Sequence, residues 1–545
     1  MSRLLLILWL ALPVALGAQD SLFAFVDNPF SRRFSPEPVD GYKLEVAQRI
    51  FDDLVKARGS FRMPVPELVM NTGRRYMAWM HPGKRQIGLE EQAYDICVSL
   101  GKDSLNALAA MLSHEIIHYY ENHDWKRNFI NQNDGLEAAE QLEKLSDGLK
   151  YETQADYFGG VLAISAGYNT YSTLAPLLEK AYATYGLPDE IQGYPSLSER
   201  LKLSENTARR LEKLFQVYQT ANYLSLIEGY TDALEYYQYI LGEYQGFELY
   251  NNAGATALLA ALDLTPKNAM PYVLPIELDL ESRLGQITTR LPKDAAASRA
   301  QLLEQGQQLF KNALLLNEAE PSAHLNLANL HVIREEWLDA EYRAQKALAL
   351  AEKAGNAPAA AKAQVTLGVA AILQKDTSTA LAYFQSAESE VIDLAKINLS
   401  VLQGGAEPYA PGNYNVKGVE EIDGVFPEDF LVAPSFTATV NLPGKIYCGY
   451  KNMPTSNIFQ HYVDDGSNRF AWFHRTDSDY QGETLAGLSA GATAAEIRTA
   501  YGVPNRILSL PNGQCLAYDQ RQLLLLTDET GQLRSWIVFR SGLTE

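Results

Sequence analysis

Cysteine is the residue that this sequence has least of: Cys97, Cys448 and Cys515 are the 3 cysteines among 545 residues. A disulfide-built scaffold needs many more, so hydrophobic cores must hold the fold together. Cys448 and Cys515 fall in one C-terminal segment, and a bond between them in an oxidising compartment stays open. Cys97 is then predicted to be a buried free thiol.

Positive charge is also in short supply. The chain has 46 lysines and arginines against 66 aspartates and glutamates, which gives a formal net charge of −20. Nucleic acid and anionic lipid surfaces attract such a chain only through a local basic patch, and the sequence shows none. We therefore expect protein or peptide partners and no nucleic acid.

Long apolar runs are absent after the first residues of the chain. Residues 1–18 combine a basic start at Arg3, an apolar stretch and a small-residue exit at Gly17 and Ala18, a pattern typical of a cleaved secretory signal. No later segment approaches the roughly 20 apolar residues of a transmembrane helix. No cysteine follows the cut, which argues against a lipid anchor. The sequence thus predicts a periplasmic or secreted protein without a transmembrane anchor.

Histidine is rare as well, with 8 residues in the chain, yet two of them stand four apart in a helix-forming run. His114 and His118 frame the pentapeptide His-Glu-Ile-Ile-His, and residues four apart lie on one face of a helix. Both imidazoles should therefore point at one place, as two ligands of a zinc ion do. Glu115 is placed to act as the general base on a water molecule there.

A third ligand is predicted 34 residues after the second histidine. Glu152 and Asp156 lie one turn apart on another apolar-striped helix. Glu152 can complete the zinc site, and Asp156 can accept the other ring N–H of His114. The rival motif with a third histidine fails, because Glu121 replaces its glycine and Asp124 replaces its histidine.

The motif HExxH followed by ExxAD resembles the gluzincin metallopeptidases of the HtpX and BepA type. Residues 76–89 resemble the family's edge strand and turn, which pair with an extended substrate, although Met77-Ala78 replaces the usual Asn-Ala. Residues 194–200 resemble the family's His-Pro-x-x-x-x-Arg motif, with Tyr194 in place of the histidine. The resemblance implies an α+β zinc endopeptidase domain over residues 19–204.

Tyr194 departs from this family in a way that affects the chemistry. In BepA-like members the histidine can bind the metal and keep the enzyme inactive. A phenol is a weaker zinc ligand and a good donor to an oxyanion, so Tyr194 is predicted to be catalytic together with Glu115. The alternative is that Tyr194 only packs at a helix start before Pro195.

Residues 205–403 are predicted to form tetratricopeptide-like helical repeats. Small residues recur at identical offsets of 12 and 19 in two segments, which begin at Ala328 and Gly368. One 34-residue period earlier stand Gly306, Phe310 and Ala313, and a separate, weaker array runs from Ala221 to Gly254. The six extra residues near 354–358 should bulge between two repeats. Stacked helix pairs form a concave surface, which we expect to bind substrates and possible envelope-assembly proteins, unless the segment is a plain alanine-rich bundle.

Residues 404–545 read as a small α+β domain after a Gly- and Pro-rich linker. A helix over 491–504 is predicted, with Thr493 as its N-cap and Glu496 three residues on. Four strands should follow in an antiparallel meander, over residues 506–510, 514–518, 522–527 and 533–539. The stretch near 484–540 resembles the SmpA/OmlA (BamE-like) envelope domains.

The expected fold is therefore multidomain and mainly α, with a gluzincin-type α+β domain, tetratricopeptide repeats and a C-terminal α+β domain. The expected function is that of an exported zinc (Zn²⁺) endopeptidase in quality control of envelope or outer-membrane proteins. The alternative is a chaperone-like or adaptor protein that acts mainly through its repeats, with little proteolysis.

Overall fold

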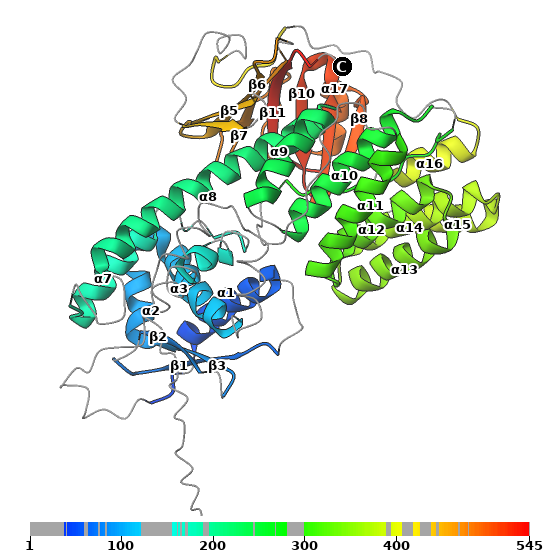
Figure 1. The fold of residues 1–545 in the computed structure, drawn as a ribbon. Coiled ribbons are helices and arrows are strands. Elements are labelled where there is room, and N and C mark those ends of the chain that lie inside the picture. Colours follow the sequence, from blue (N-terminus) through cyan, green and yellow to red (C-terminus); the bar gives the residue numbers. More distant parts are fainter. Residues whose placement is uncertain are drawn as a thin grey trace, which may run out of the picture.

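The structure of the protein is a computed structural model in which part of the chain is described. The described residues are 37–39, 41–58, 64–74, 77–81, 84–120, 155–160, 162–163, 166–168, 170, 173–188, 196–243, 246–266, 269–280, 299–387, 394–405, 418–425, 438–442, 446–466, 469–477 and 479–543. The predicted signal peptide, Glu152 and Tyr194 lie outside these residues. Helices dominate the described part, and a separate sheet forms its C-terminal end, as expected for a mainly α, multidomain chain (Figure 1).

The N-terminal region combines a small mixed sheet with helices. Its sheet has the strand order β1-β3-β2, in which β1 runs parallel and β2 antiparallel to the central β3. The elements are α1 (Tyr42–Arg58), β1 (Glu67–Asn71), β2 (Ala78–His81), β3 (Gln86–Glu90), α2 (Glu91–Val98), α3 (Ser104–Tyr120) and α7 (Leu174–Tyr185). The strand expected at the edge, within residues 76–89, is β2, and it does lie at an edge of this sheet.

Helix α3 is the central helix of this region. All ten residues from Ala107 to Ile116 are buried, so the helix contacts protein on every side rather than along one stripe. It packs against α1, α2, α7 and the edge strand β2. The polar residues that α3 carries in this stretch are therefore removed from water.

Helix α8 (Leu197–Leu226) joins the N-terminal region to the rest of the chain. It starts with a capping box, in which Ser196 and Glu199 each accept a hydrogen bond from the other's backbone N–H. The helix continues for 30 residues and passes without a break through the predicted domain boundary at 204 and 205. In Figure 1, α8 runs diagonally from the N-terminal region to the underside of the C-terminal sheet.

Further helices follow α8 along the chain. They are α9 (Tyr230–Glu243), α10 (Phe247–Asp263), α11 (Arg299–Leu316), α12 (Pro321–Ile333), α13 (Trp337–Lys353), α14 (Ala357–Leu373), α15 (Thr377–Ala387) and α16 (Leu394–Leu402). They pack in pairs, α8 with α9, α10 with α11, α12 with α13 and α14 with α15, and α16 follows the last pair. A Cβ on Gly254 would come within 2.6 Å of the Phe310 ring, and one on Gly368 within 2.5 Å of the Phe384 ring. Helices α10 and α11 thus pack in the same way as α14 and α15.

This packing corrects the expectation of a separate, weaker array that ends at Gly254. Gly254 and Gly306 are equivalent to Gly368 and Ala380, but 52 residues separate the first two and 12 separate the second two. About 40 extra residues therefore stand between these two positions, most of them in the connection between α10 and α11. The insertion hides the period in the sequence, whereas packing restores it in space.

The predicted bulge near residues 354–358 is wrong. Only residues 354–356 separate α13 from α14, and each of these helices has 17 residues. The extra residues lengthen the helices, because the alanines and leucines around the junction are strong helix formers. Gly355 takes a left-handed conformation with φ 67°, and Asn356 caps α14.

The C-terminal part forms one antiparallel sheet with the strand order β4-β5-β6-β7-β11-β10-β9-β8. Its elements are β4 (Ala438–Leu442), β5 (Ile446–Asn452), β6 (Ser456–Val463), β7 (Phe470–Thr476), α17 (Ala494–Tyr501), β8 (Arg506–Leu510), β9 (Gly513–Tyr518), β10 (Leu523–Thr527) and β11 (Leu533–Ser541). The predicted helix, its Thr493 cap and the last four strands are confirmed. Strands β4 to β7 were not predicted.

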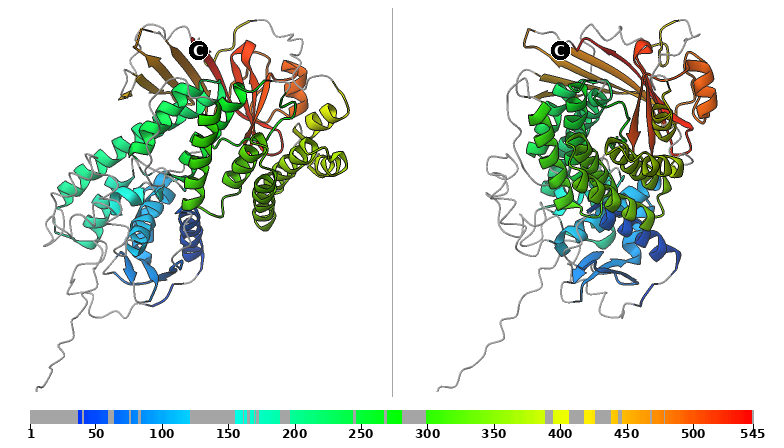
Figure 2. Two further views of the ribbon diagram at one scale, coloured as in Figure 1. Left: turned by 45° about the vertical axis from the view of Figure 1, so that its right-hand side comes forward. Right: turned by 90° about the vertical axis from the view of Figure 1, so that its right-hand side faces the viewer.

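The sheet packs on the helices through a common hydrophobic core. This core includes side chains of α8 to α16 together with strands β5 to β11, whereas the N-terminal region has a core of its own. Tyr223 of α8, for example, meets the rings of Phe459 and Phe473 at centroid distances of 5.1 and 5.5 Å. Both views in Figure 2 show the sheet against the helices and away from the N-terminal region.

All three cysteines are free and buried. Cys448 lies on β5 and Cys515 on β9, so no bond joins them, and Cys97 is a buried thiol as expected. Burial raises the pKa of each thiol to about 12, which leaves little reactive thiolate. Among the described helices, none has both the length and the apolar character needed to cross a membrane.

Candidate metal centre

His114 and His118 bring their ring nitrogens together on α3. The two Nε2 atoms lie 3.0 Å apart, and the rings stand at 74° with centroids 4.7 Å apart. Two histidines that bind one tetrahedral zinc ion at about 2.0–2.1 Å hold their nitrogens roughly 3.3 Å apart. The pair therefore fits the geometry of two ligands of a single zinc ion.

Asp156 sets the protonation of His114. The Nδ1 atom of His114 lies 2.9 Å from Oδ1 of Asp156, and the exposed fractions of the two side chains are 2% and 3%. An ionised carboxylate only accepts hydrogen bonds, so the proton of a neutral imidazole resides on Nδ1. The lone pair of Nε2 then faces His118, which is the tautomer that a metal ligand requires.

Arg200 fixes Asp156 in turn. Its Nη2 atom donates to Oδ1 and Oδ2 of Asp156 at 2.9 and 3.0 Å, and its Nε atom donates to Oδ2 at 3.3 Å. Burial on its own would raise the pKa of Asp156, but the charge of Arg200 and the contact with His114 outweigh it and lower the pKa to about 2. The carboxylate is therefore ionised and held in one orientation.

Gly159 allows the helical segment at 155–160 to lie directly against α3. A Cβ at Gly159 would stand 2.9 Å from the backbone nitrogen of His114 and 3.0 Å from its Cα. Any side chain here would push the two segments apart, because both nearest atoms are backbone. The absence of a side chain at this position is what brings Asp156 within reach of the histidine.

Glu115 lies between the two candidate ligands, and the sequence predicts a proton-transfer role for it. It follows His114 on α3 and has an exposed fraction of 0%. Of the predicted site, the structure brings together His114, His118 and Asp156, with Glu115 on the same helix. Glu152 and Tyr194 lie outside the described residues, and their roles stay predictions.

Another group of possible metal ligands lies in a turn between α12 and α13. His331, Glu336 and Asp339 are, within the described ranges, the one set of three whose ligand atoms approach one another closely enough. The Nδ1 atom of His331 lies 2.5 Å from Oε2 of Glu336, and Asp339 is exposed. This contact closes a helix-helix turn, so we assign it a structural role.

Two residues of the site were missed by reasoning from sequence. Arg200 ends the stretch that resembles the His-Pro-x-x-x-x-Arg motif, so its position was a signal that it has a partner near the candidate metal site. Gly159 follows Asp156 by three residues, at a place where an apolar helix has no local need for glycine. Neither contact is local, since Arg200 lies 44 residues from Asp156.

Comparison of the chain with models of known protein families gives no match, and comparison with curated proteins gives none either. The function must therefore be argued from the geometry of the site and from the sequence motif.

Proposed function

We propose that the chain is a zinc-dependent endopeptidase. The observation that carries this proposal is the convergence of His114 and His118 on one point, with Asp156 and Arg200 fixing the protonation of the first. Metal-binding histidines usually have such a carboxylate behind them, whereas two histidines that only pack in a core do not need one. Glu152 is the proposed third ligand.

The chemistry at this site would divide between the ion and the protein. A zinc ion supplies a Lewis acid, which polarises a scissile carbonyl and acidifies a water molecule. Glu115 takes a proton from the attacking water and delivers it to the leaving amine. Asp156 keeps the His114 ring in place during these transfers, and Tyr194 is the proposed donor to the oxyanion.

The edge strand β2 is the proposed place for substrate main chain. It pairs with β3 on one side, and none of the described strands pairs with its other edge. Helix α3 packs against β2, which places this edge close to the helix that carries the ligands. A polypeptide added to a strand edge is held by main-chain hydrogen bonds, so cleavage should read sequence only loosely.

The setting of the reaction is part of the same proposal. The signal-like residues 1–18 and the resemblance to SmpA/OmlA domains favour an exported enzyme that acts on envelope proteins. The pairs α12/α13 and α14/α15 have the offsets of tetratricopeptide repeats, and α10 packs on α11 in the same way despite the insertion. We propose that the helices from α8 to α16 belong to that class.

Elemental analysis and casein digestion test the proposal. We expect one zinc ion per chain after gentle purification, and we expect Glu115→Gln to keep the zinc while it abolishes cleavage. Glu91→Gln, a change at a partly exposed carboxylate of α2, is the control and should leave both unchanged. Wild-type protein without zinc, or full cleavage by Glu115→Gln, would sink the proposal.

A further inference from the structure

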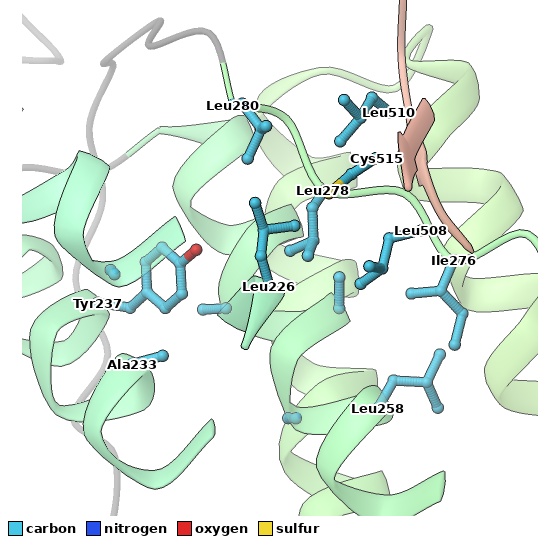
Figure 3. Close-up of a cluster of buried hydrophobic side chains, with 14 of the residues drawn as sticks. Leu226, Ala233, Tyr237, Leu258, Ile276, Leu278, Leu280, Leu508, Leu510 and Cys515 are labelled. Carbon is cyan, nitrogen blue, oxygen red and sulfur yellow. The ribbon is translucent and has the colours of Figure 1, made fainter. Parts of the chain in front are cut away.

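Residues 272–280, here called the strap, lie extended between the helix pairs and the C-terminal sheet. The strap belongs to the insertion between α10 and α11. Figure 3 shows its Ile276, Leu278 and Leu280 among buried side chains of the helices and of β8 and β9. The strap therefore occupies the surface on which an external partner was expected.

Three asparagines grip the main chain of the strap. Each donates from its side-chain amide to the C=O of one strap residue and accepts from the N–H of that same residue, at distances of 2.7 to 2.9 Å. The pairs are Asn398 with Val273, Asn326 with Glu277, and Asn252 with Asp279. Asn329 donates to the C=O of Pro275 at 3.1 Å, so the gripped residues alternate along the strap.

The gripping side chains come from the first helices of two pairs and from α16, which follows the last pair. Asn252 is on α10, Asn326 on α12 and Asn398 on α16, and each has an exposed fraction of 0%. At the end of the strap, Gln219 of α8 donates to the C=O of Leu280 at 3.0 Å. These helices therefore form one groove, and the strap runs through it against the order of the pairs.

A buried asparagine is costly unless its amide donates and accepts. The N–H and C=O of a single residue in extended conformation satisfy both functions at once, whatever its side chain. Several buried asparagines on equivalent helices, each matched to a main-chain N–H and C=O, make a surface that recognises extended polypeptide. The groove thus has the chemistry of a peptide-binding site.

The side chains of the strap add a preference to this main-chain grip. Leu274, Ile276, Leu278 and Leu280 alternate with the gripped residues and are buried. Glu277 points the other way, where its Oε1 lies 2.5 Å from Nζ of Lys362 on α14. Both of these side chains are at most 3% exposed, so the groove matches one acidic side chain at this position.

The sheet closes the groove from the opposite side. Leu278 donates its N–H to the C=O of Ser509 at 3.1 Å, and Glu277 pairs in parallel with Ser509 of the edge strand β8. Lys362 also donates to the C=O of Leu510 at 2.6 Å. The strap is therefore held by helices on one side and by a strand edge on the other.

We propose that the groove of α8, α10, α12, α14 and α16 is a binding site for extended peptides, and that the strap fills it in cis and excludes external ones. The peptide that fits has apolar side chains at alternate positions and an acidic side chain opposite Lys362. With the strap seated, this face does not select substrates for the metal centre. This inference does not depend on zinc or on proteolysis.

Binding of a labelled peptide with the sequence of residues 270–281 tests the proposal by fluorescence anisotropy. The full-length wild type should not bind it, because the strap is in place. The double variant Ile276→Ser, Leu278→Ser has a weakened strap and should bind it, at least tenfold more tightly than it binds a scrambled peptide. Adding Asn326→Leu to the double variant should remove the binding.

Three results would overturn the proposal: a folded double variant that does not bind, a wild type that binds equally well, or binding that survives Asn326→Leu. Far-UV circular dichroism checks that each variant is folded. If the double variant is unfolded, Glu277→Gln takes its place, because it keeps the apolar anchors and loses only the ion pair with Lys362. That variant must then bind the natural peptide more tightly than wild type does.

Discussion

The candidate metal centre and the strap groove both bury polar side chains on apolar helices, but the hydrogen-bonding groups of these side chains are satisfied in different ways. In the groove, three asparagines are each matched to the N–H and C=O of one strap residue. At the metal centre His114 is matched to Asp156 on one side and points its other nitrogen at His118. The complete match in the groove shows that the strap already occupies it, whereas nitrogens that converge on one point indicate a place for an ion.

The largest effect is expected from a substitution at the candidate metal centre. His118→Gln removes one ring nitrogen, so zinc content should fall from one ion per chain to near zero and casein cleavage should be lost. The strap groove should not change, and the labelled peptide should still fail to bind. Elemental analysis and digestion measure the first effect, and anisotropy measures the second. Normal zinc content in this variant would place the ion elsewhere.

A substitution in the groove should instead cost stability. Asn326→Leu leaves the N–H and C=O of Glu277 without their amide partner, and we expect a loss of about 2–5 kcal/mol in the free energy of unfolding. Gln308→Leu on the exposed face of α11 is the control and should change it by less than about 0.5 kcal/mol. Urea titration followed by circular dichroism compares the two. Equal losses would mean that the asparagine grip is unimportant.

The C-terminal sheet should lose stability at a higher pH than the candidate metal centre does. His474 on β7 is 2% exposed, and its burial lowers its pKa to about 4. The unfolded chain has a histidine pKa near 6.5, so the folded state prefers the neutral ring. Its contribution, at most about 3 kcal/mol, is complete above about pH 6.5 and is lost as the pH falls toward 4.

Calorimetry at pH 7.5 and 5.0 measures this effect. His474→Gln keeps a polar contact for Ser456, which lies 2.9 Å from Nε2 of His474, and removes the titration. The fall in Tm between the two pH values should be smaller in the variant than in wild type. Asp156 behaves differently, because its pKa is lowered to about 2. Its contribution to stability is complete above the ordinary carboxyl pKa and is lost only as the pH falls below about 4. An identical fall in Tm in both proteins would exclude His474 as the titrating group.

The smallest effect should come from Asp156, which supports the candidate ligand His114. Asp156→Asn keeps the volume of the side chain but loses its charge, and zinc affinity should weaken by roughly 10–100-fold without loss of a ligand. Competition with a chelator measures the affinity, and Asp95→Asn, at a half-exposed side chain of α2, is the matched control. If wild type and Asp156→Asn release zinc at the same chelator concentration, Asp156 only joins two helices.

The parts that sequence predicted are those set by local geometry. The facing of His114 and His118 follows from the helical period, and the strands β8 to β11 follow from apolar runs between turn residues. Asp156 was placed by its spacing from Glu152 and by the resemblance to a family. The prediction of a bulge near residues 354–358 failed, because the spacing of small residues does not show whether extra residues lengthen two helices or the turn between them.

The parts that sequence missed depend on contacts between distant residues. Arg200 meets Asp156 across 44 residues, and Asn398 meets Val273 across 125. An asparagine in an apolar helix indicates that it has a buried hydrogen-bond partner, but the sequence does not show which residue that partner is. The strap was hidden for the same reason, since its grip comes from four different helices.

One helix spans the distance between the two regions compared above. Arg200 near the start of α8 orients Asp156, and Gln219 nineteen residues later holds the end of the strap. At a rise of about 1.5 Å per residue, these two side chains are separated by roughly 28 Å of continuous helix. A continuous helix resists twisting, so α8 rigidly couples the orientations of its two ends. The helix pairs cannot rotate about its axis without carrying the Arg200 guanidinium away from the carboxylate that orients His114.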